Sequence, residues 1–258
     1  MQNHLIGMVH LPALPGAPYF DGSMDALVTR AVSDAVTLER AGFDALIVEN
    51  FGDIPFFKDA VPPATIASMA VAVARVIERV SIPVGVNVLR NDAKGALSIA
   101  AATGASFVRV NVLSGVMFTD QGIIEGQAAD VARLRSEIAP HVEVFADVFV
   151  KHAVPPVGLE LARAAEDLAA RAGADVLILS GSGTGTPTDL TPVEALRRAC
   201  PGVPLVVGSG ATADTVATLL ERVDGVIVGT AIEVDGRTAN PVDPRRAAAL
   251  VSAARASR

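Results

Sequence analysis

Eight short apolar runs rich in β-branched residues alternate along the chain with longer amphipathic segments. Runs of this kind, bounded by turn residues, are typical of buried strands, and each is followed by apolar residues at helical spacing, most clearly over Asp25–Ala41. The predicted strands are Leu5–Leu11, Ala45–Asn50, Val84–Leu89, Phe107–Val112, Glu143–Val150, Val176–Ser180, Leu205–Gly210 and Gly225–Ile232. The remaining helices are predicted near residues 65–80, 92–103, 126–139, 158–172, 191–200, 213–222 and 243–255.

The spacing of these elements predicts how the strands are connected. Strand starts recur roughly every thirty residues, the length of one βα unit, and parallel strands joined by helices cross over in a right-handed sense. An open doubly wound sheet is the alternative, but no Gly-x-Gly-x-x-Gly follows the first strand. We therefore predict a (β/α)₈ TIM barrel that occupies residues 1–258 as one domain.

Loop lengths indicate which end of the barrel carries function. The turns that lead into strands are short, whereas the segments that follow strands are longer, namely 11–24, 50–64, 112–125 and 180–190. The loops after the strands build the active sites of TIM barrels, so we expect the site at the carboxyl ends of the strands.

Several polar residues stand at inward-facing strand positions. Side chains alternate along a strand, so the valines of Phe107–Val112 face the helices while Arg109 and Asn111 point into the barrel. The same alternation turns further polar side chains inward, namely His10, Glu49, Asn87, Asp147 and Ser180. A structural layer of ion pairs is one explanation, but charges that are costly to bury also gather at functional sites, which we favour.

A denser polar cluster follows the fifth strand. Lys151 shares strand parity with Asp147 if the strand runs on, and it can bind phosphate, act as a base or form an imine with a carbonyl. His152 can shuttle protons near neutral pH, and a solvated strand end is the structural alternative. The predicted catalytic residues are Glu49, Arg109, Asn111, Asp147, Lys151 and His152.

Two glycine-containing turns end the seventh and eighth strands, and they suggest a phosphate site. Gly208-Ser209-Gly210 and Gly229-Thr230 each join a strand to a helical stretch, and barrels often hold phosphate between these two loops. Tight strand–helix packing is the alternative, and loop 180–190 can be either a lid or a linker. The predicted phosphate- or substrate-binding residues are His10, Asn50, Asn87, Arg90, Ser180, Gly181, Gly208, Ser209, Gly210, Gly229 and Thr230.

Charge and composition narrow the range of partners and cofactors. A net charge of -7 argues against nucleic acid and anionic lipid, and the single cysteine excludes a disulfide framework. We expect a cytoplasmic protein without a signal peptide or transmembrane segment, and homo-oligomerisation stays open. No cofactor motif or metal-ligand spacing is evident, although Mg²⁺ bound near Glu49, Asp53 or Asp147 stays open.

Several stretches together resemble the BtpA family of barrel proteins. They are residues 10–16, 49–56, 87–92, 109–111, 120–122, 147–152, 180–185, 208–210, 228–230 and 241–243. The resemblance covers nearly the whole chain and implies a barrel fold independently of the strand count. One departure is Glu233, where a lysine is common after the eighth strand, which argues against a basic phosphate clamp there.

The resemblance implies two different kinds of function. The family takes its name from a role in photosystem I biogenesis at thylakoid membranes, while other members look like enzymes of sugar or nucleoside metabolism. Our hypothesis is an enzyme that acts on a small phosphorylated metabolite, such as a sugar or nucleoside phosphate, as an isomerase, a lyase or an enzyme of glycosidic-bond cleavage. The alternative is a non-catalytic assembly factor for a membrane complex, whose expected signature is an exposed apolar patch.

Overall fold

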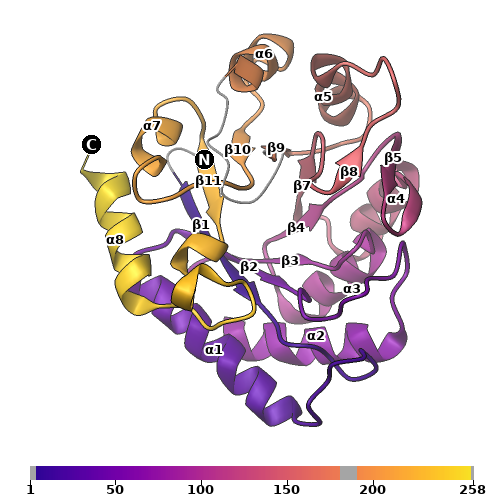
Figure 1. Cartoon of the computed structure of the whole chain (residues 1–258). Helices are drawn as coiled ribbons and strands as arrows, with labels where there is room; N and C mark the ends of the chain where they lie inside the picture. The colour runs from indigo at the N-terminus through magenta and orange to yellow at the C-terminus, as the bar shows by residue number, and fades with distance from the viewer. Residues whose placement is uncertain (1–3, 181–190, 257–258) are drawn as a thin grey trace.

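A computed structural model describes residues 4–180 and 191–256, and it contains a closed barrel of eight parallel strands (Figure 1). Neighbouring strands pair in the order β1-β11-β10-β9-β7-β4-β3-β2, and β1 pairs with both β2 and β11 to close the ring. The barrel strands are β1 (His4–His10), β2 (Ala45–Glu49), β3 (Val84–Asn87), β4 (Phe107–Val110), β7 (Glu143–Asp147), β9 (Val176–Leu179), β10 (Leu205–Val207) and β11 (Gly225–Val228). The predicted TIM barrel is confirmed.

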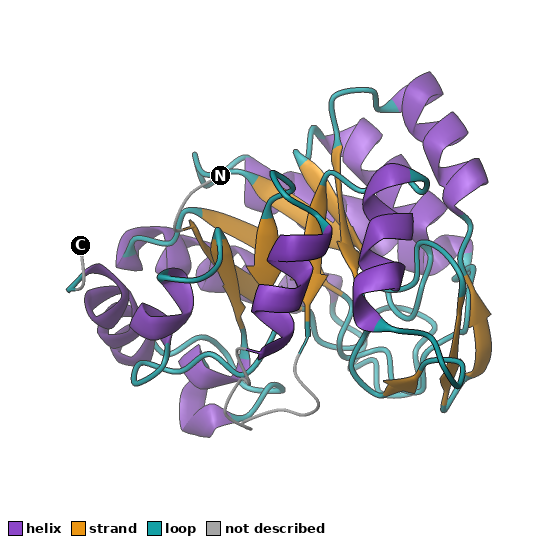
Figure 2. Cartoon of the chain, turned by 90° about the horizontal axis from the view of Figure 1, so that it is seen from above, coloured by secondary structure: helices purple, strands orange, loops and turns teal. Residues whose placement is uncertain are grey.

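Helices surround the barrel on its outside, as Figures 1 and 2 show from two directions. The helices are α1 (Met24–Ala41), α2 (Pro63–Ile77), α3 (Ala93–Thr103), α4 (Ala128–Ile138), α5 (Leu161–Ala170), α6 (Thr191–Ala199), α7 (Val216–Leu220) and α8 (Pro244–Arg255). Short helical turns η1 (Thr230–Ile232) and η2 (Val234–Gly236) follow β11. Each barrel strand is thus followed by a helix, as the sequence pattern predicted.

Two separate apolar layers fix which way each strand side chain points. Alternate residues such as Phe107 and Phe145 fill the interior of the barrel, where their rings stack with centroids 4.4 Å apart. The other strand face, with Val108 and Val144, packs against the helices. Gly85 leaves room for the Phe107 ring, since a Cβ atom there would lie 2.2 Å from it. Arg109 and Asp147 follow the interior phenylalanines at the same parity and therefore also point inward.

The region after β4 differs from the prediction of a loop over 112–125. It forms the hairpin β5 (Val116–Thr119) and β6 (Gly122–Glu125), and β8 (Ala153–Val154) adds to β5 to make a small antiparallel sheet outside the barrel (Figure 2). Buried Met117 and Ile124 pack with Val112 and Val150 beneath this sheet. No helix among the described residues is long and apolar enough to cross a membrane.

Candidate functional site

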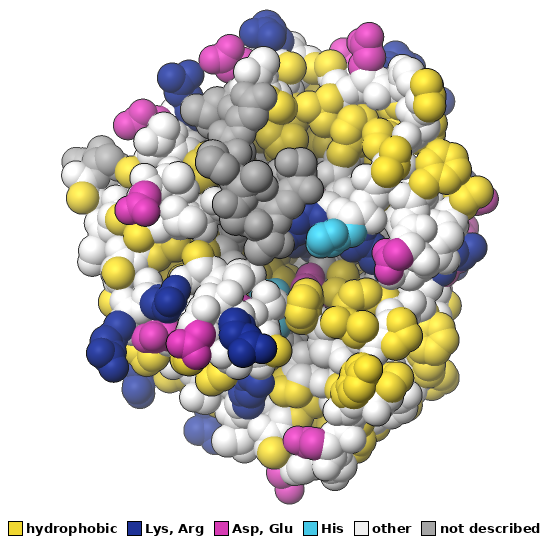
Figure 3. Space-filling model, in the orientation of Figure 1, with side chains coloured by type: hydrophobic (Ala, Val, Ile, Leu, Met, Phe, Trp, Pro, Cys, Tyr) yellow, Lys and Arg dark blue, Asp and Glu magenta, His cyan; other side chains and the backbone are white. Residues whose placement is uncertain are grey.

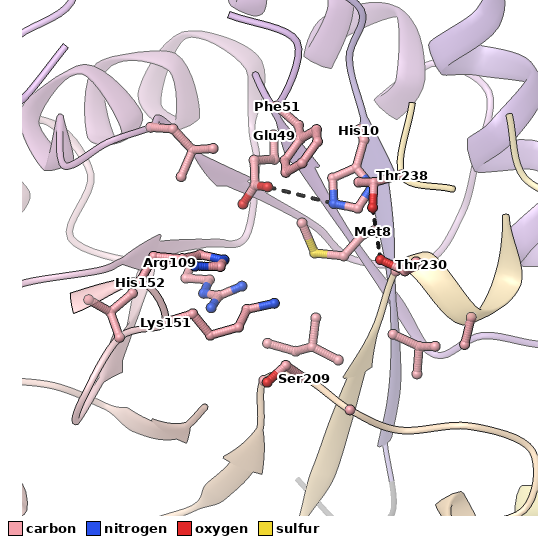
Figure 4. Close-up of a pocket in the computed structure, with 18 of the residues that line it drawn as sticks. Met8, His10, Glu49, Phe51, Arg109, Lys151, His152, Ser209, Thr230 and Thr238 are labelled. Carbon is pink, nitrogen blue, oxygen red and sulfur yellow. Dashed lines mark hydrogen bonds and ion pairs between the residues drawn. The ribbon is translucent and has the colours of Figure 1, made fainter. Parts of the chain in front are cut away.

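A cavity of about 400 Å³ lies at the carboxyl ends of the barrel strands (Figures 3 and 4). Its walls come from the ends of β1, β2, β4 and β11 and from the loops that follow β2, β3, β4, β7, β10 and β11. The polar side chains that line it are His10, Glu49, Arg90, Arg109, Asn111, Lys151, His152, Ser209, Thr212, Thr230 and Thr238. Acid–base groups and small hydroxyl residues therefore share one space.

The floor of the cavity is built on a buried ion pair between β4 and β7. The Arg109 guanidinium donates from Nε and Nη2 to the two Asp147 oxygens at 2.9 and 3.0 Å. Asn111 Nδ2 and Ser180 Oγ also donate to Asp147, at 3.0 and 2.7 Å. Burial disfavours the charged guanidinium, but the attraction and hydrogen bonds of Asp147 outweigh that effect and raise the pKa of Arg109.

The position of Asp147 corrects the expectation that Glu49, Arg109 and Asp147 converge in one pocket. Glu49 and Arg109 line the cavity, but the Asp147 side chain is fully buried beneath it. All of its oxygens accept hydrogen bonds from the protein, so they are not directed at a ligand. Asp147 therefore orients Arg109 and Asn111 and does not line the cavity, and its catalytic role stays a prediction.

His10 lies between two carboxylates at the end of β1, and Figure 4 shows one of them, Glu49. Its Nδ1 atom is 2.6 Å from Glu233 Oε1, and its Nε2 atom is 3.6 Å from Glu49 Oε1. Glu233 is buried behind the ring, whereas His10 and Glu49 both face the cavity. A carboxylate bonded to Nδ1 holds the proton on that nitrogen, which leaves Nε2 available toward the cavity.

Packing fixes the orientation of the His10 ring. The Phe51 ring lies against it with centroids 5.0 Å apart, and Phe56 extends this aromatic wall, 6.5 Å from Phe51. On another side the ring contacts Gly229, where a Cβ atom would come within 2.8 Å of His10 Cε1. Glycine at this position therefore makes room for the imidazole.

Lys151 enters the cavity from a turn, because β7 ends at Asp147 and does not run on to residue 150. Arg90 Nη2 donates to the Lys151 carbonyl oxygen, which holds this turn, and His152 follows with a φ of 57°. Figure 4 shows the Lys151 side chain extending toward the middle of the cavity. Burial, together with the nearby charge of Arg109, lowers the pKa of Lys151.

The lowered pKa predicts a pH-dependent effect of Lys151 on stability. The unfolded chain holds the Lys151 proton more tightly than the folded protein, so the free energy of unfolding rises with pH between the lowered and the ordinary pKa. Lys151→Met removes this term. We expect its stability relative to the parent to be highest below the lowered pKa and to fall as pH rises toward about 10.4. Urea denaturation across a pH series measures the difference.

A matched control is Lys94→Met, which removes an exposed lysine that pairs with Asp130 at 3.6 Å. We expect its stability difference from the parent to show no such fall over the same pH range. Parallel pH curves for Lys151→Met and the parent would show that burial does not disfavour the Lys151 ammonium.

The glycine turns after β10 and β11 line the same side of the cavity. Gly208, Ser209 and Gly210 come from the first turn, and Gly229 and Thr230 come from the second. Gly208 has no space for a Cβ atom, which would lie 2.5 Å from Ile178 Cγ2. The Thr230 hydroxyl bonds the Thr238 hydroxyl at 2.8 Å. The two turns are thus adjacent, as a shared phosphate site requires.

Other residues predicted to bind substrate have structural contacts instead. Asn50 Oδ1 accepts from Leu89 N at 2.7 Å and its Nδ2 donates to Asp53, which joins the loops after β2 and β3. Asn87 donates to the Arg109 carbonyl oxygen at 3.1 Å, and Ser180 bonds Asp147. These three predicted ligands do not line the cavity. Gly181 and most of the predicted 180–190 loop lie outside the described residues.

The structure does not assemble the carboxylates that were considered for Mg²⁺. Asp53 accepts a hydrogen bond from Leu14 N at 2.7 Å, and Asp147 is bound to Arg109, so neither joins Glu49 in the cavity. Within residues 4–180 and 191–256, no group of three or more His, Cys, Asp or Glu side chains is arranged to hold a metal ion.

Sequence reasoning missed three parts of the site. Glu233 stands out in the sequence only as a departure from a family pattern, yet it is the hydrogen-bond partner of His10. Phe51 and Phe56, in the loop after β2, supply the aromatic wall. A lone carboxylate just after the last apolar strand was the available signal for Glu233, but its partner lies 223 residues away.

Fold and cavity define a TIM-barrel protein whose polar site lies at the carboxyl ends of its strands. The sequence profile of the BtpA family matches residues 1–256, and the chain belongs to this family. It is 50% identical over 251 residues to an uncharacterized protein of Thermococcus kodakarensis, with 97% of this chain and 95% of the relative covered. It is 44% identical over 251 residues to the photosystem I biogenesis protein BtpA of Synechocystis sp., covering 97% and 88%.

Solved structures that resemble the chain share its barrel. N-(5'-phosphoribosyl)anthranilate isomerase from Pyrococcus furiosus superposes with a TM-score of 0.61 at 17% identity, covering 98% of both chains. Phosphoribosyl anthranilate isomerase from Thermus thermophilus gives 0.61 at 12% identity, covering 99% and 100%. At these identities the likeness establishes the fold alone.

Proposed function

We propose that this protein is an enzyme that acts on a small phosphorylated metabolite carrying a carbonyl group, as an isomerase or a lyase. The observation that carries the proposal is the shared cavity: acid–base groups His10 and Glu49 lie in the same space as the glycine turns after β10 and β11. Proton transfer next to a carbonyl needs a positioned base, and the loops after the seventh and eighth barrel strands often hold phosphate.

The arrangement of charges favours proton transfer over glycosidic-bond cleavage. Most glycosidases place two carboxyl groups on either side of the scissile bond. Glu49 is the only carboxylate among the described residues that line the cavity, since Asp147 and Glu233 are bound behind it. His10 and Glu49 instead provide two proton carriers on one wall, beside Lys151 and Arg109 on another (Figure 4).

A negative charge introduced at Thr230 tests whether phosphate binds between the two glycine turns. Thr230→Asp puts a carboxylate beside the proposed phosphate, and an aspartate suits the first position of the η1 turn, so the fold is expected to persist. We expect phosphate at about 100 times its Kd to stabilise the parent by about 2.7 kcal/mol, and Thr230→Asp to remove the effect. Thermal unfolding with and without phosphate measures it.

The matched control is Ser98→Asp, which adds the same charge at an exposed position of α3. We expect this variant to respond to phosphate as the parent does. Equal stabilisation of Thr230→Asp and the parent would mean that phosphate binds elsewhere. No response in the parent, to phosphate or to sugar phosphates, would argue against a phosphorylated substrate.

An exposed apolar row favours one second candidate, an assembly factor. Phe118 pairs directly with Ile123 on β6 and with Val154 on β8, so all three point to the same face of the small sheet. They are 47, 47 and 64% exposed. Figure 3 shows hydrophobic side chains gathered on the side where β5 and β8 lie in Figure 1. If the protein is an assembly factor, Thr230→Asp is expected to leave its function unchanged. A charged residue introduced into this apolar row is then expected to impair it.

A further inference from the structure

The three lysines of the chain differ in their surroundings. Lys58 and Lys94 are exposed, and each pairs with an aspartate, Asp59 at 3.4 Å and Asp130 at 3.6 Å. Lys151 is half-buried in the cavity, and no hydrogen bond or ion pair joins its Nζ atom to any described residue. Lys151 therefore does not pair with a surface carboxylate as Lys58 and Lys94 do.

The groups around Lys151 favour its neutral, nucleophilic form. Arg109 and Arg90 place positive charge beside the amine, and the wall includes apolar Val150 and Met8. The lowered pKa of Lys151 follows from this burial and repulsion. Glu49 and Asp147 oppose the effect but do not cancel it. Desolvated lysines beside a second cation are activated as nucleophiles in this way.

The backbone around Lys151 is held by contacts that direct the side chain inward. Arg90 comes from the loop after β3 and donates to the Lys151 carbonyl oxygen. Val150, immediately before it, is buried beneath the small sheet, and His152, immediately after it, is exposed where it lines the cavity. The amine therefore points at the same space as His10 and the glycine turns.

We propose that Lys151 forms an imine with the carbonyl carbon of the substrate, which deepens and rests on the proposed isomerase or lyase function. The Nζ lone pair adds to the carbonyl carbon while the oxygen takes a proton, giving a carbinolamine. The nitrogen then loses a proton, and the hydroxyl leaves as water after a second protonation. His10 and Glu49 carry these protons, and the C=N bond accepts the electron pair of an adjacent C–H or C–C bond. Hydrolysis of the product imine regenerates the amine.

Borohydride trapping tests the imine with simple carbonyl phosphates as probes. The intact protein is incubated with dihydroxyacetone phosphate or ribose 5-phosphate, reduced with sodium borohydride and mapped by peptide mass spectrometry. Borohydride converts an imine to a stable secondary amine. We expect label at Lys151 to form faster than at Lys58 or Lys94, which serve as internal controls, because a lowered pKa leaves more of the Lys151 amine neutral at the same pH.

Variants and a dephosphorylated probe separate the outcomes. We expect Lys151→Arg, which keeps the charge, to lose the label, and dihydroxyacetone to label Lys151 more slowly than its phosphate. Equal labelling of all three lysines, or undiminished label in Lys151→Arg, would overturn the imine. A protein that phosphate stabilises but that no probe labels would overturn the imine alone. A protein that neither responds to phosphate nor is labelled would overturn the proposed function as well.

Discussion

Asp147→Asn is expected to lower the free energy of unfolding by about 3–5 kcal/mol, the cost of leaving one member of a buried ion pair without its partner. The asparagine amide keeps the size of the side chain but presents an NH₂ group where a carboxylate oxygen accepts from Arg109 or Ser180. The guanidinium then stays buried without the carboxylate to which it is bonded. In a chain of this size each kcal/mol lowers the Tm by about 2–4 °C. Urea and thermal denaturation measure the loss.

A carboxylate at the surface, partly exposed, provides the control for this substitution. Asp167→Asn removes a charge that pairs with Arg163 on the surface of α5, at 3.3 Å, and exposed pairs contribute little. We expect it to change stability by no more than about 0.5 kcal/mol. A double variant, Arg109→Met with Asp147→Leu, is expected to be more stable than Asp147→Asn, because it removes both buried charges. Similar melting of Asp147→Asn and Asp167→Asn would show that the Arg109 charge is compensated elsewhere.

This expectation reverses what the sequence suggested for Asp147. Alternation along the strand correctly predicted that the side chain points inward, and the strand–helix rhythm correctly predicted the barrel. The alternation did not predict whether the Asp147 carboxylate reaches the cavity. It fixes the face of the strand on which a side chain lies, but not which neighbouring side chains cover it. The Asp147 carboxylate is closed off from the cavity because Arg109, Asn111 and Ser180 all donate hydrogen bonds to it.

The same limit explains the other differences in the site. Short polar motifs such as Glu49–Asp53 show which residues lie near a strand end, but the direction of each side chain in the loop depends on distant partners. Asn50 turns away from the cavity because Leu89, 39 residues later, offers its amide. The hairpin β5–β6 differs from the predicted loop because its four-residue strands pair with each other outside the barrel and break the βα rhythm.

The His10–Glu233 pair provides the second large expected effect, on proton transfer. With Glu233 Oε1 2.6 Å from Nδ1, that nitrogen carries the proton, and Nε2 faces Glu49 and the cavity. Glu233→Leu removes the acceptor, so the neutral ring is expected to place its proton on Nε2 instead, toward Glu49. With its proton on Nε2, the ring can no longer accept a proton from the cavity side, and turnover of a substrate is expected to fall by about 10²–10⁴-fold.

Nitrogen-15 spectroscopy of the histidine side chains measures the tautomer directly, in the intact protein and without a substrate. At a pH where the ring is neutral, we expect the parent to show a protonated Nδ1 and an unprotonated Nε2 for His10, assigned from its loss in His10→Gln. Glu233→Leu is expected to exchange the two signals, and Glu233→Gln, whose amide oxygen can still accept, to keep the parent pattern. Proton on Nε2 in the parent would mean that Glu233 does not orient the ring. The tautomer separates an orienting role of Glu233 from simple packing. If Glu233 only filled space, its replacement would change the melting temperature and leave both nitrogen signals of His10 in place.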